Sequence, residues 1–266
     1  MTKQDKNEAL EHIEDKELKI TVAKVLDKAM RFEKTDKVEY THFLDLYETR
    51  KCEALLHHFH IPYVRYQPCE DGDKSILLFI PSYILDPNTW IQQVVSCIKM
   101  IPKQKGILQH KDYMGSLYHL GIKREYIGDI IAKEACAYVF VMTSQVDFLL
   151  QQLGKVGRQE VVLQIIPLQS PEVINLEVSY LLKEIIVPSL RIDAVLSQVF
   201  PGSRNEMKKK ILQGDLFVNC KNCISSAQLV QEGDVVSLKS CGKIKIGMCI
   251  RKTRSENLVL QIKKYN

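Results

Sequence analysis

Residues 203–220, "SRNEMKKKILQGDLFVNC", carry the signals of a short helix, a stop and a strand. Ser203 can cap the helix, and Glu206 stands three residues later, where a capping box needs it. Gly214 supplies the left-handed residue that commonly ends a helix. The alternating run 216–219 then predicts a half-buried strand.

The faces of this predicted helix are chemically distinct. Met207 and Ile211 are four residues apart and share one face, which we expect to be buried. The basic residues lie on the remaining surface, where the helix would hold them outward; they are Arg204, Lys208, Lys209 and Lys210. A rigid row of cations of this kind favours a polyanionic partner.

The charge of the chain supports the same interpretation. The whole chain has 37 Lys and Arg against 32 Asp and Glu. From Val187 to Asn266 we count 14 against 6, a net charge of +8, which leaves 23 against 26, or −3, for the residues before. This asymmetry predicts a nucleic-acid-binding module on a nearly neutral body. On charge alone, a solvated basic surface stays open as the alternative.

Length and composition predict a globular protein of two or three domains, with 266 residues of which 45% are apolar. The first residues are charged and lack the apolar stretch of a secretory signal. The longest uncharged runs, such as 87–98, fall well short of the roughly 20 residues that span a bilayer. We therefore expect a cytoplasmic protein.

Eight cysteines occur at irregular intervals, which for a reducing compartment predicts free thiols. A zinc site has to be considered, because four of them follow one another in the basic third: Cys220, Cys223, Cys241 and Cys249. The first two have metal-ligand spacing, but seven residues separate the last two, whereas four-cysteine sites usually close with a second tight pair. We predict no metal and no cofactor, and a hairpin that closes on Lys221 and Asn222.

The pattern along the chain predicts an α+β protein. Its regions are an N-terminal, mostly helical region (1–73), a central small α/β domain (74–183), a domain of two helices on a small sheet (187–248) and a basic strand or tail (249–266). In the central domain we expect strands at 75–81, 137–142 and 160–166 and helices at 86–98, 110–122 and 144–157. The direction of strand pairing is not readable from these patterns.

Residues 190–246 resemble the ribosomal-protein-S4-like RNA-binding domain over its whole length. The matching features are Arg191 and Asp193, Ser203 and Arg204, Gly214, Val218 and Asn219, and Gly233 and Asp234. The resemblance implies two helices against a small sheet, with the second helix and the following turn contacting structured RNA. The RNA-binding residues it implies, together with their basic neighbours, are Arg191, Asp193, Ser203, Arg204, Lys208, Lys209, Lys210, Gln213, Asn219 and Lys221.

The upstream part is similar to the middle domain of the YlmH proteins, bacterial S4-like proteins typically encoded beside cell-division genes. The similar segments are 108–130 and 149–161, and the resemblance covers about residues 75 to 266. It departs from the family at Lys111, where Arg is usual, and at Cys220, where Gly is usual. It implies a non-enzymatic protein that binds rRNA and tRNA on the large ribosomal subunit, in quality control of stalled nascent chains.

Two groups in the central domain have alternative interpretations. Lys123 and Arg124 follow a predicted helix, where they either hold RNA phosphates or compensate the helix dipole. Three tyrosines, Tyr113, Tyr118 and Tyr126, either stack on bases or pack in the core, and their spacing favours the core.

Other functions were weighed against RNA binding. A pseudouridine synthase would need a catalytic domain after the module, and a methyltransferase would need a glycine-rich loop after a strand. The sequence offers neither, so no catalytic residue is predicted. A cell-division adaptor that binds a protein partner through the N-terminal amphipathic helix stays open, alone or alongside RNA binding.

Overall fold

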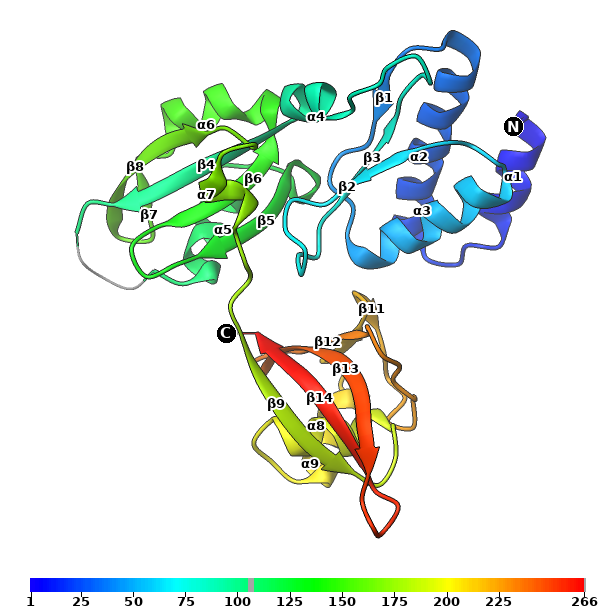
Figure 1. Ribbon diagram of the computed structural model, residues 1–266, viewed down its shortest axis with the longest axis vertical. Coiled ribbons are helices and arrows are strands. Elements are labelled where there is room, and N and C mark those ends of the chain that lie inside the picture. Colours follow the sequence, from blue (N-terminus) through cyan, green and yellow to red (C-terminus); the bar gives the residue numbers. More distant parts are fainter. Residues whose placement is uncertain (105–107, 266) are drawn as a thin grey trace. The chain divides into compact units, whose positions relative to one another are not determined.

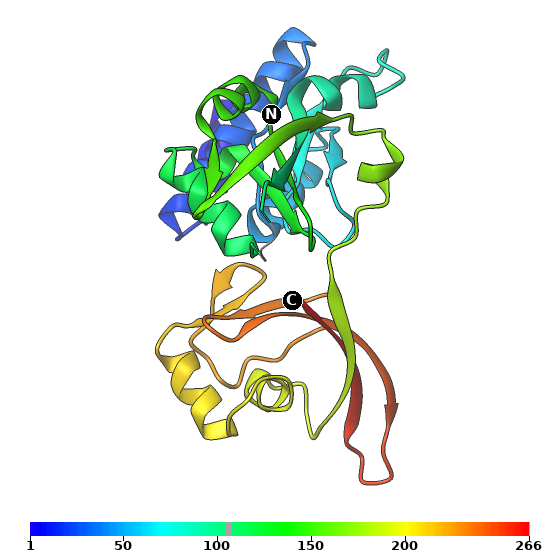
Figure 2. The ribbon, with the colours of Figure 1, turned by 90° about the vertical axis from the view of Figure 1, so that its left-hand side faces the viewer.

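The computed structural model describes residues 1–104 and 108–265, which form two compact units, Met1–Glu177 and Val178–Asn266 (Figures 1 and 2). We refer to them as the N-terminal unit and the C-terminal unit. Helices and sheets occur in both, so the predicted α+β class is confirmed. Across the part of the chain that the structure describes, no helix combines the length and the apolar character that a membrane crossing requires.

The N-terminal unit begins with three helices beside a small antiparallel sheet of order β1-β3-β2 (Figure 1). Asp15 caps the second helix, and Asp45 forms a capping box with Glu48 at the third. The elements are α1 (Lys3–Glu11), α2 (Lys16–Thr35), β1 (Glu39–Tyr40), α3 (Leu46–His58), β2 (Val64–Tyr66) and β3 (Ile76–Phe79). The apolar stripe of α2 packs with α3 and β3, as the helical periodicity predicts.

The middle part of this unit is a five-stranded sheet of order β5-β6-β4-β8-β7, with all neighbours antiparallel. Helices α5 and α6 share one core with one face of the sheet. The elements are α4 (Asn88–Val94), β4 (Val95–Pro102), α5 (His110–His119), the short 3₁₀ turns η1 (Arg124–Tyr126) and η2 (Thr143–Gln145), β5 (Ile127–Ala132), β6 (Ala137–Met142), α6 (Val146–Gln152), β7 (Lys155–Val156), β8 (Gln159–Ile166) and α7 (Pro171–Ile174).

The helix predicted over 86–98 is wrong in its second half. Helix α4 ends at Val94, and β4 begins at the next residue and pairs with β6 on one side and β8 on the other. Ile98 and Met100 alternate into the core, while Lys99 between them binds Glu172 on the other face. A central strand with two neighbours outweighs the local helical periodicity.

The first and middle parts of the N-terminal unit are packed together rather than linked loosely. The Phe43 amide donates to the Glu125 carbonyl at 2.9 Å. Gly128 lies against the Phe43 ring so closely that a Cβ there would stand 2.7 Å from it. Strand β3 pairs with β1 and β2 of the first sheet. The predicted boundary between residues 73 and 74 assigns β3 to the central domain and its partners β1 and β2 to the N-terminal region. The observed sheet therefore spans this boundary.

The C-terminal unit is a six-stranded antiparallel sheet of order β11-β10-β12-β13-β14-β9 with two helices packed on it (Figure 2). The elements are β9 (Tyr180–Val187), α8 (Ile192–Val199), α9 (Arg204–Leu212), β10 (Leu216–Val218), β11 (Lys221–Asn222), β12 (Val235–Leu238), β13 (Gly242–Lys252) and β14 (Leu258–Tyr265). Met207 and Ile211 of α9 are fully buried in this core, as their spacing predicts.

The limits of this unit differ from the predicted ones. Strand β9 pairs along its whole length with β14, from Tyr180 opposite Tyr265 to Val187 opposite Leu258. The unit therefore begins before residue 187. Of the predicted strand or tail at the C-terminal end, residues 249–252 complete β13 and 258–265 form β14.

The hairpin after β10 turns two residues earlier than predicted. Asn219 and Cys220 both have positive φ, 51° and 67°, and Val218 pairs with Lys221 across them. Two central residues of this kind make a type I′ turn, which matches the twist of the strands it joins. Lys221 and Asn222 belong to β11 instead of forming the turn.

Candidate nucleic-acid interface

A buried carboxylate organises the basic surface of the C-terminal unit. Asp193 lies in the first turn of α8, and 0% of its surface is exposed. Arg191 donates from Nε to Oδ1 and from Nη2 to Oδ2, both at 3.2 Å. Arg204 of α9 donates from Nη2 to Oδ1 at 2.9 Å, and the Lys208 ammonium lies 3.8 Å from Oδ2. One carboxylate thus holds three cations in place.

The pKa of Asp193 reflects this arrangement. Burial raises the pKa of the carboxyl, but hydrogen bonds from Arg204 and then Arg191 outweigh the burial and lower it to about 2. The group is therefore ionised at neutral pH and compensates part of the surrounding positive charge. The three cations are each about 40% exposed at the side chain. Asp193 orients these cations, and its own carboxylate is covered by them.

The sequence of α9 explains why the cations meet at Asp193. Ser203 accepts from the Glu206 amide and Glu206 accepts from the Ser203 amide, which closes the predicted capping box. Arg204 and Lys208 follow one turn apart and face α8, while Met207 faces the sheet core. Ser203 therefore serves as a helix cap, with its hydroxyl oxygen already engaged.

The other predicted residues of α9 differ in their surroundings. Lys209 and Gln213 are exposed. Lys210 is half-buried, and its ammonium donates to the Cys241 Sγ at 3.0 Å and is therefore directed toward the sheet. The basic surface consists of Arg191, Arg204, Lys208 and Lys209, and we call it the α9 surface.

The two RNA-binding residues predicted in the hairpin, Asn219 and Lys221, also differ in their surroundings. Asn219 donates to the Asp234 Oδ1 at 2.8 Å and accepts from the Val235 amide at 2.9 Å. Its side chain stabilises the junction between β10 and β12, which is a structural role that the sequence did not assign to it. Lys221 is exposed on β11.

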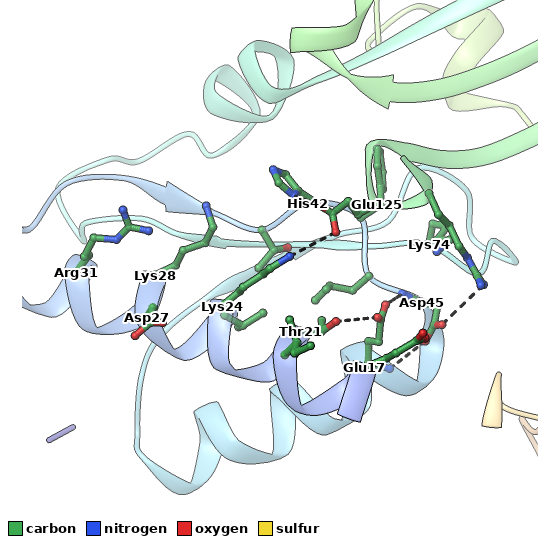
Figure 3. A pocket seen from close by; sticks show the side chains of 17 residues that line it. Glu17, Thr21, Lys24, Asp27, Lys28, Arg31, His42, Asp45, Lys74 and Glu125 are labelled. Carbon is green, nitrogen blue, oxygen red and sulfur yellow. Dashed lines mark hydrogen bonds and ion pairs between the residues drawn. The ribbon is translucent and has the colours of Figure 1, made fainter. Parts of the chain in front are cut away.

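Lys123 and Arg124 lie in the N-terminal unit, whereas the α9 surface belongs to the C-terminal unit. Both are exposed in the turn that leads into β5. The Arg124 guanidinium is 3.9 Å from the Asp45 carboxylate. It also lines a cleft of about 490 Å³ between α2 and residues 41–48 (Figure 3), which we call the α2 cleft.

The charges of the α2 cleft are balanced. Its lining carries five basic residues, Lys24, Lys28, Arg31, Lys74 and Arg124, and five acidic ones, Glu17, Asp27, Asp45, Glu48 and Glu125. Figure 3 shows the Lys24 side chain reaching Glu125, to which the distance is 3.6 Å. His42 lies 3.4 Å from the same carboxylate, and burial lowers the pKa of this imidazole more than Glu125 raises it.

The three tyrosines for which base stacking and core packing were the alternatives differ in their surroundings. Tyr113 is buried in the core at 1% exposure, as expected for core packing. Tyr126 lies edge-on to His42, with ring centroids 4.7 Å apart. Tyr118 is 41% exposed.

Within residues 1–104 and 108–265, no group of three or more His, Cys, Asp or Glu side chains is arranged to hold a metal ion. Cys220 and Cys223 stand on either side of β11, and both are half-buried. That the protein needs no metal stays a prediction.

The middle part matches a family model described as "Putative RNA-binding domain in YlmH" over residues 95–170. The chain is 27% identical over 183 residues, 69% of this chain and 70% of the relative, to a Bacillus subtilis (strain 168) protein named "Ribosome-associated protein quality control protein P2". The solved structure titled "Cell division protein ylmH from Streptococcus pneumoniae" aligns with a TM-score of 0.48 and 18% identity, covering 59% of this chain and 94% of that chain.

The matched segment begins at the first residue of β4 and includes all five strands of the middle sheet. The segments that resemble the YlmH proteins, 108–130 and 149–161, lie in this middle part, and Arg191 and Arg204 of the S4-like motif lie on the α9 surface. Together with the similarity to the Bacillus protein, this match supports the resemblance to the YlmH proteins, with a putative RNA-binding domain over residues 95–170.

Proposed function

We propose that this protein binds structured RNA, both rRNA and tRNA, on the large ribosomal subunit and acts in the quality control of stalled nascent chains in the cytoplasm. The α9 surface carries the proposal, because three cations there share a single buried carboxylate and so leave a positive excess. Lys and Arg placed in this way gain free energy from counterion release when they meet phosphates. The name of the Bacillus relative supports the ribosomal context.

The protein acts by binding and not by catalysis. Asp193 is covered by its three cations, and its lowered pKa makes it a weak base. Burial raises the pKa of the Cys69 and Cys97 thiols to about 12, so both are poor nucleophiles. These features favour a binding protein over an RNA-modifying enzyme.

The direct test is co-sedimentation of the full chain with purified large and small ribosomal subunits, followed by sequencing of crosslinked RNA. We expect association with the large subunit and crosslinks to both rRNA and tRNA. If about six phosphates are contacted, affinity for the large subunit should fall by roughly three orders of magnitude between 50 and 200 mM salt.

The same experiment can overturn the proposal. Equal retention by small and large subunits would contradict the subunit assignment. A salt titration without a slope would contradict phosphate binding by the α9 surface, since released counterions are its thermodynamic signature.

A further inference from the structure

The middle part of the N-terminal unit contains a second basic surface that the sequence interpretation did not include. A groove of about 650 Å³ runs between α5 and the segment that joins α6 to β8. Lys111, Gly115 and His119 line it from α5, and Gly154, Lys155 and Gly157 line it from the opposite side. All six residues are exposed.

The charges of this groove are not balanced as those of the α2 cleft are. Lys111 and Lys155 are its lysines, and His119 adds a third nitrogen donor. The acid in the described lining is Asp112, and its Oδ2 is occupied by the Gln109 amide at 2.8 Å, where it completes the cap of α5. The groove therefore presents positive charge to a ligand.

Gly115 lies in the interior of α5, where glycine costs up to about 1 kcal/mol relative to alanine. A Cβ at this position would meet nothing within 4 Å, so packing does not explain the glycine. Gly128 is different, because a Cβ there would stand 2.7 Å from the Phe43 ring. A side chain at residue 115 would project into the groove. Because glycine has none, a ligand in the groove can approach the backbone of α5.

The two walls of the groove are held together by a hydrogen bond. The Ser116 Oγ accepts from the Gly157 amide at 3.1 Å and donates to the Asp112 carbonyl at 2.8 Å. Gly157 has a φ of +57°, which the tight turn between β7 and β8 requires. The groove is thus formed before any ligand arrives.

The lining favours an RNA backbone over a base-reading mode. Apart from the His119 imidazole, the described lining has no aromatic side chain on which a base could stack. It offers spaced nitrogen donors on one helix face, two turns apart at Lys111 and His119, and these suit phosphates. The groove also lies within the segment that matches the putative RNA-binding domain.

We propose that the groove between α5 and β7 binds the phosphodiester backbone of RNA and is a second RNA site, separate from the α9 surface. In taking RNA as its ligand, this inference rests on the proposed function. Lys111 and Lys155 hold phosphates, and Gly115 leaves room for the backbone between them. Contacts of this kind position the RNA without reading its sequence.

The test compares three full-chain variants by fluorescence anisotropy with a labelled RNA hairpin that carries a single-stranded uridine extension. Lys111→Gln with Lys155→Gln should weaken binding about tenfold at 0.15 M salt and lower the salt slope. Gly115→Leu should weaken binding while the protein unfolds at the same or a higher temperature, because leucine favours the helix. The matched control, Lys24→Gln with Lys103→Gln, removes two exposed charges elsewhere and should bind as the unmodified protein does.

The outcomes separate this inference from the proposed function. If the groove variants bind RNA normally while Lys208→Gln with Lys209→Gln does not, the groove proposal is wrong and the α9 surface stands. If neither pair of changes alters binding, RNA binding by these surfaces fails altogether. If polyglutamate binds the unmodified protein but not the groove variants, while those variants bind RNA normally, an acidic protein is the ligand of the groove and the proposal is overturned.

Discussion

The α9 surface and the α2 cleft both carry cations at helical spacing, Arg204 and Lys208 on one and Lys24, Lys28 and Arg31 in the other. The two regions differ in how these charges are compensated. In the cleft, Lys24 faces Glu125 at 3.6 Å, and Lys28 and Arg31 face Glu39 at 3.8 and 3.5 Å. On the α9 surface, three cations share Asp193 alone. From this difference we expect an excess of positive charge, rather than the number of lysines, to mark the phosphate-binding surface.

The largest expected effect comes from removing charge at the α9 surface. Lys208→Gln with Lys209→Gln should weaken binding of the full chain to large ribosomal subunits about thirtyfold at 0.15 M salt and lower the salt slope by about two. Both side chains reach the surface, so the fold should persist. Binding isotherms at several salt concentrations measure the effect, and an unchanged slope would contradict the assignment.

The next effect tests the buried carboxylate that distinguishes the two regions. Asp193→Asn leaves Arg191, Arg204 and Lys208 without their shared anion and should lower the free energy of unfolding of the C-terminal unit by about 2 kcal/mol. Hydrogen exchange of the α8 and α9 amides reports this locally. Protection that matches the unmodified protein would show that Asp193 does not hold the cluster together.

The loss of stability at low pH should have the same origin, the Asp193 carboxylate, and a similar size. The pKa of Asp193 is lowered from 3.8 to about 2, so its contribution is complete above pH 4 and is lost as pH falls toward 2. We expect the C-terminal unit to lose about 2 kcal/mol of stability across this range from this group. The Asp193→Asn protein lacks the titrating group and should show a correspondingly smaller loss, whereas an identical acid profile for both proteins would refute the linkage.

The smallest effect is expected in the α2 cleft. Lys24→Gln with Arg31→Gln also removes two cations, but each of them already faces an acid. RNA affinity should stay within about twofold, and stability should change by at most about 1 kcal/mol, as for exposed ion pairs. A loss as large as that of the α9 variant would show that local charge balance does not distinguish the two regions.

Local patterns were sufficient for much of the fold and for part of the site. The capping box at Ser203 and Glu206 and the inward pair Met207 and Ile211 follow from spacing within one helix, and the structure has them as predicted. The role of Asp193 did not follow, because its partners Arg204 and Lys208 come from another helix. The available signal was an acid in the first turn of α8, directly before the apolar residues 194–196.

The remaining differences arise from pairing between distant segments. Residues 95–98 continue a helical pattern, but they become part of β4 because β6 and β8 flank them. Asn219 was assigned to RNA by its motif, whereas its side chain links β10 to β12 through Asp234 and Val235. The α5 groove combines two segments about 40 residues apart, and neither has a marked charge pattern alone.

The position of β14 in the C-terminal sheet has a consequence for synthesis of the chain. This strand lies between β13 and β9 and pairs with both, and its residues are made after those of both partners. Until Tyr265 has left the ribosomal exit tunnel, β9 and β13 each expose an unpaired edge. Premature termination before Leu258 would therefore leave two open strand edges on one nascent chain, which is a template for aggregation.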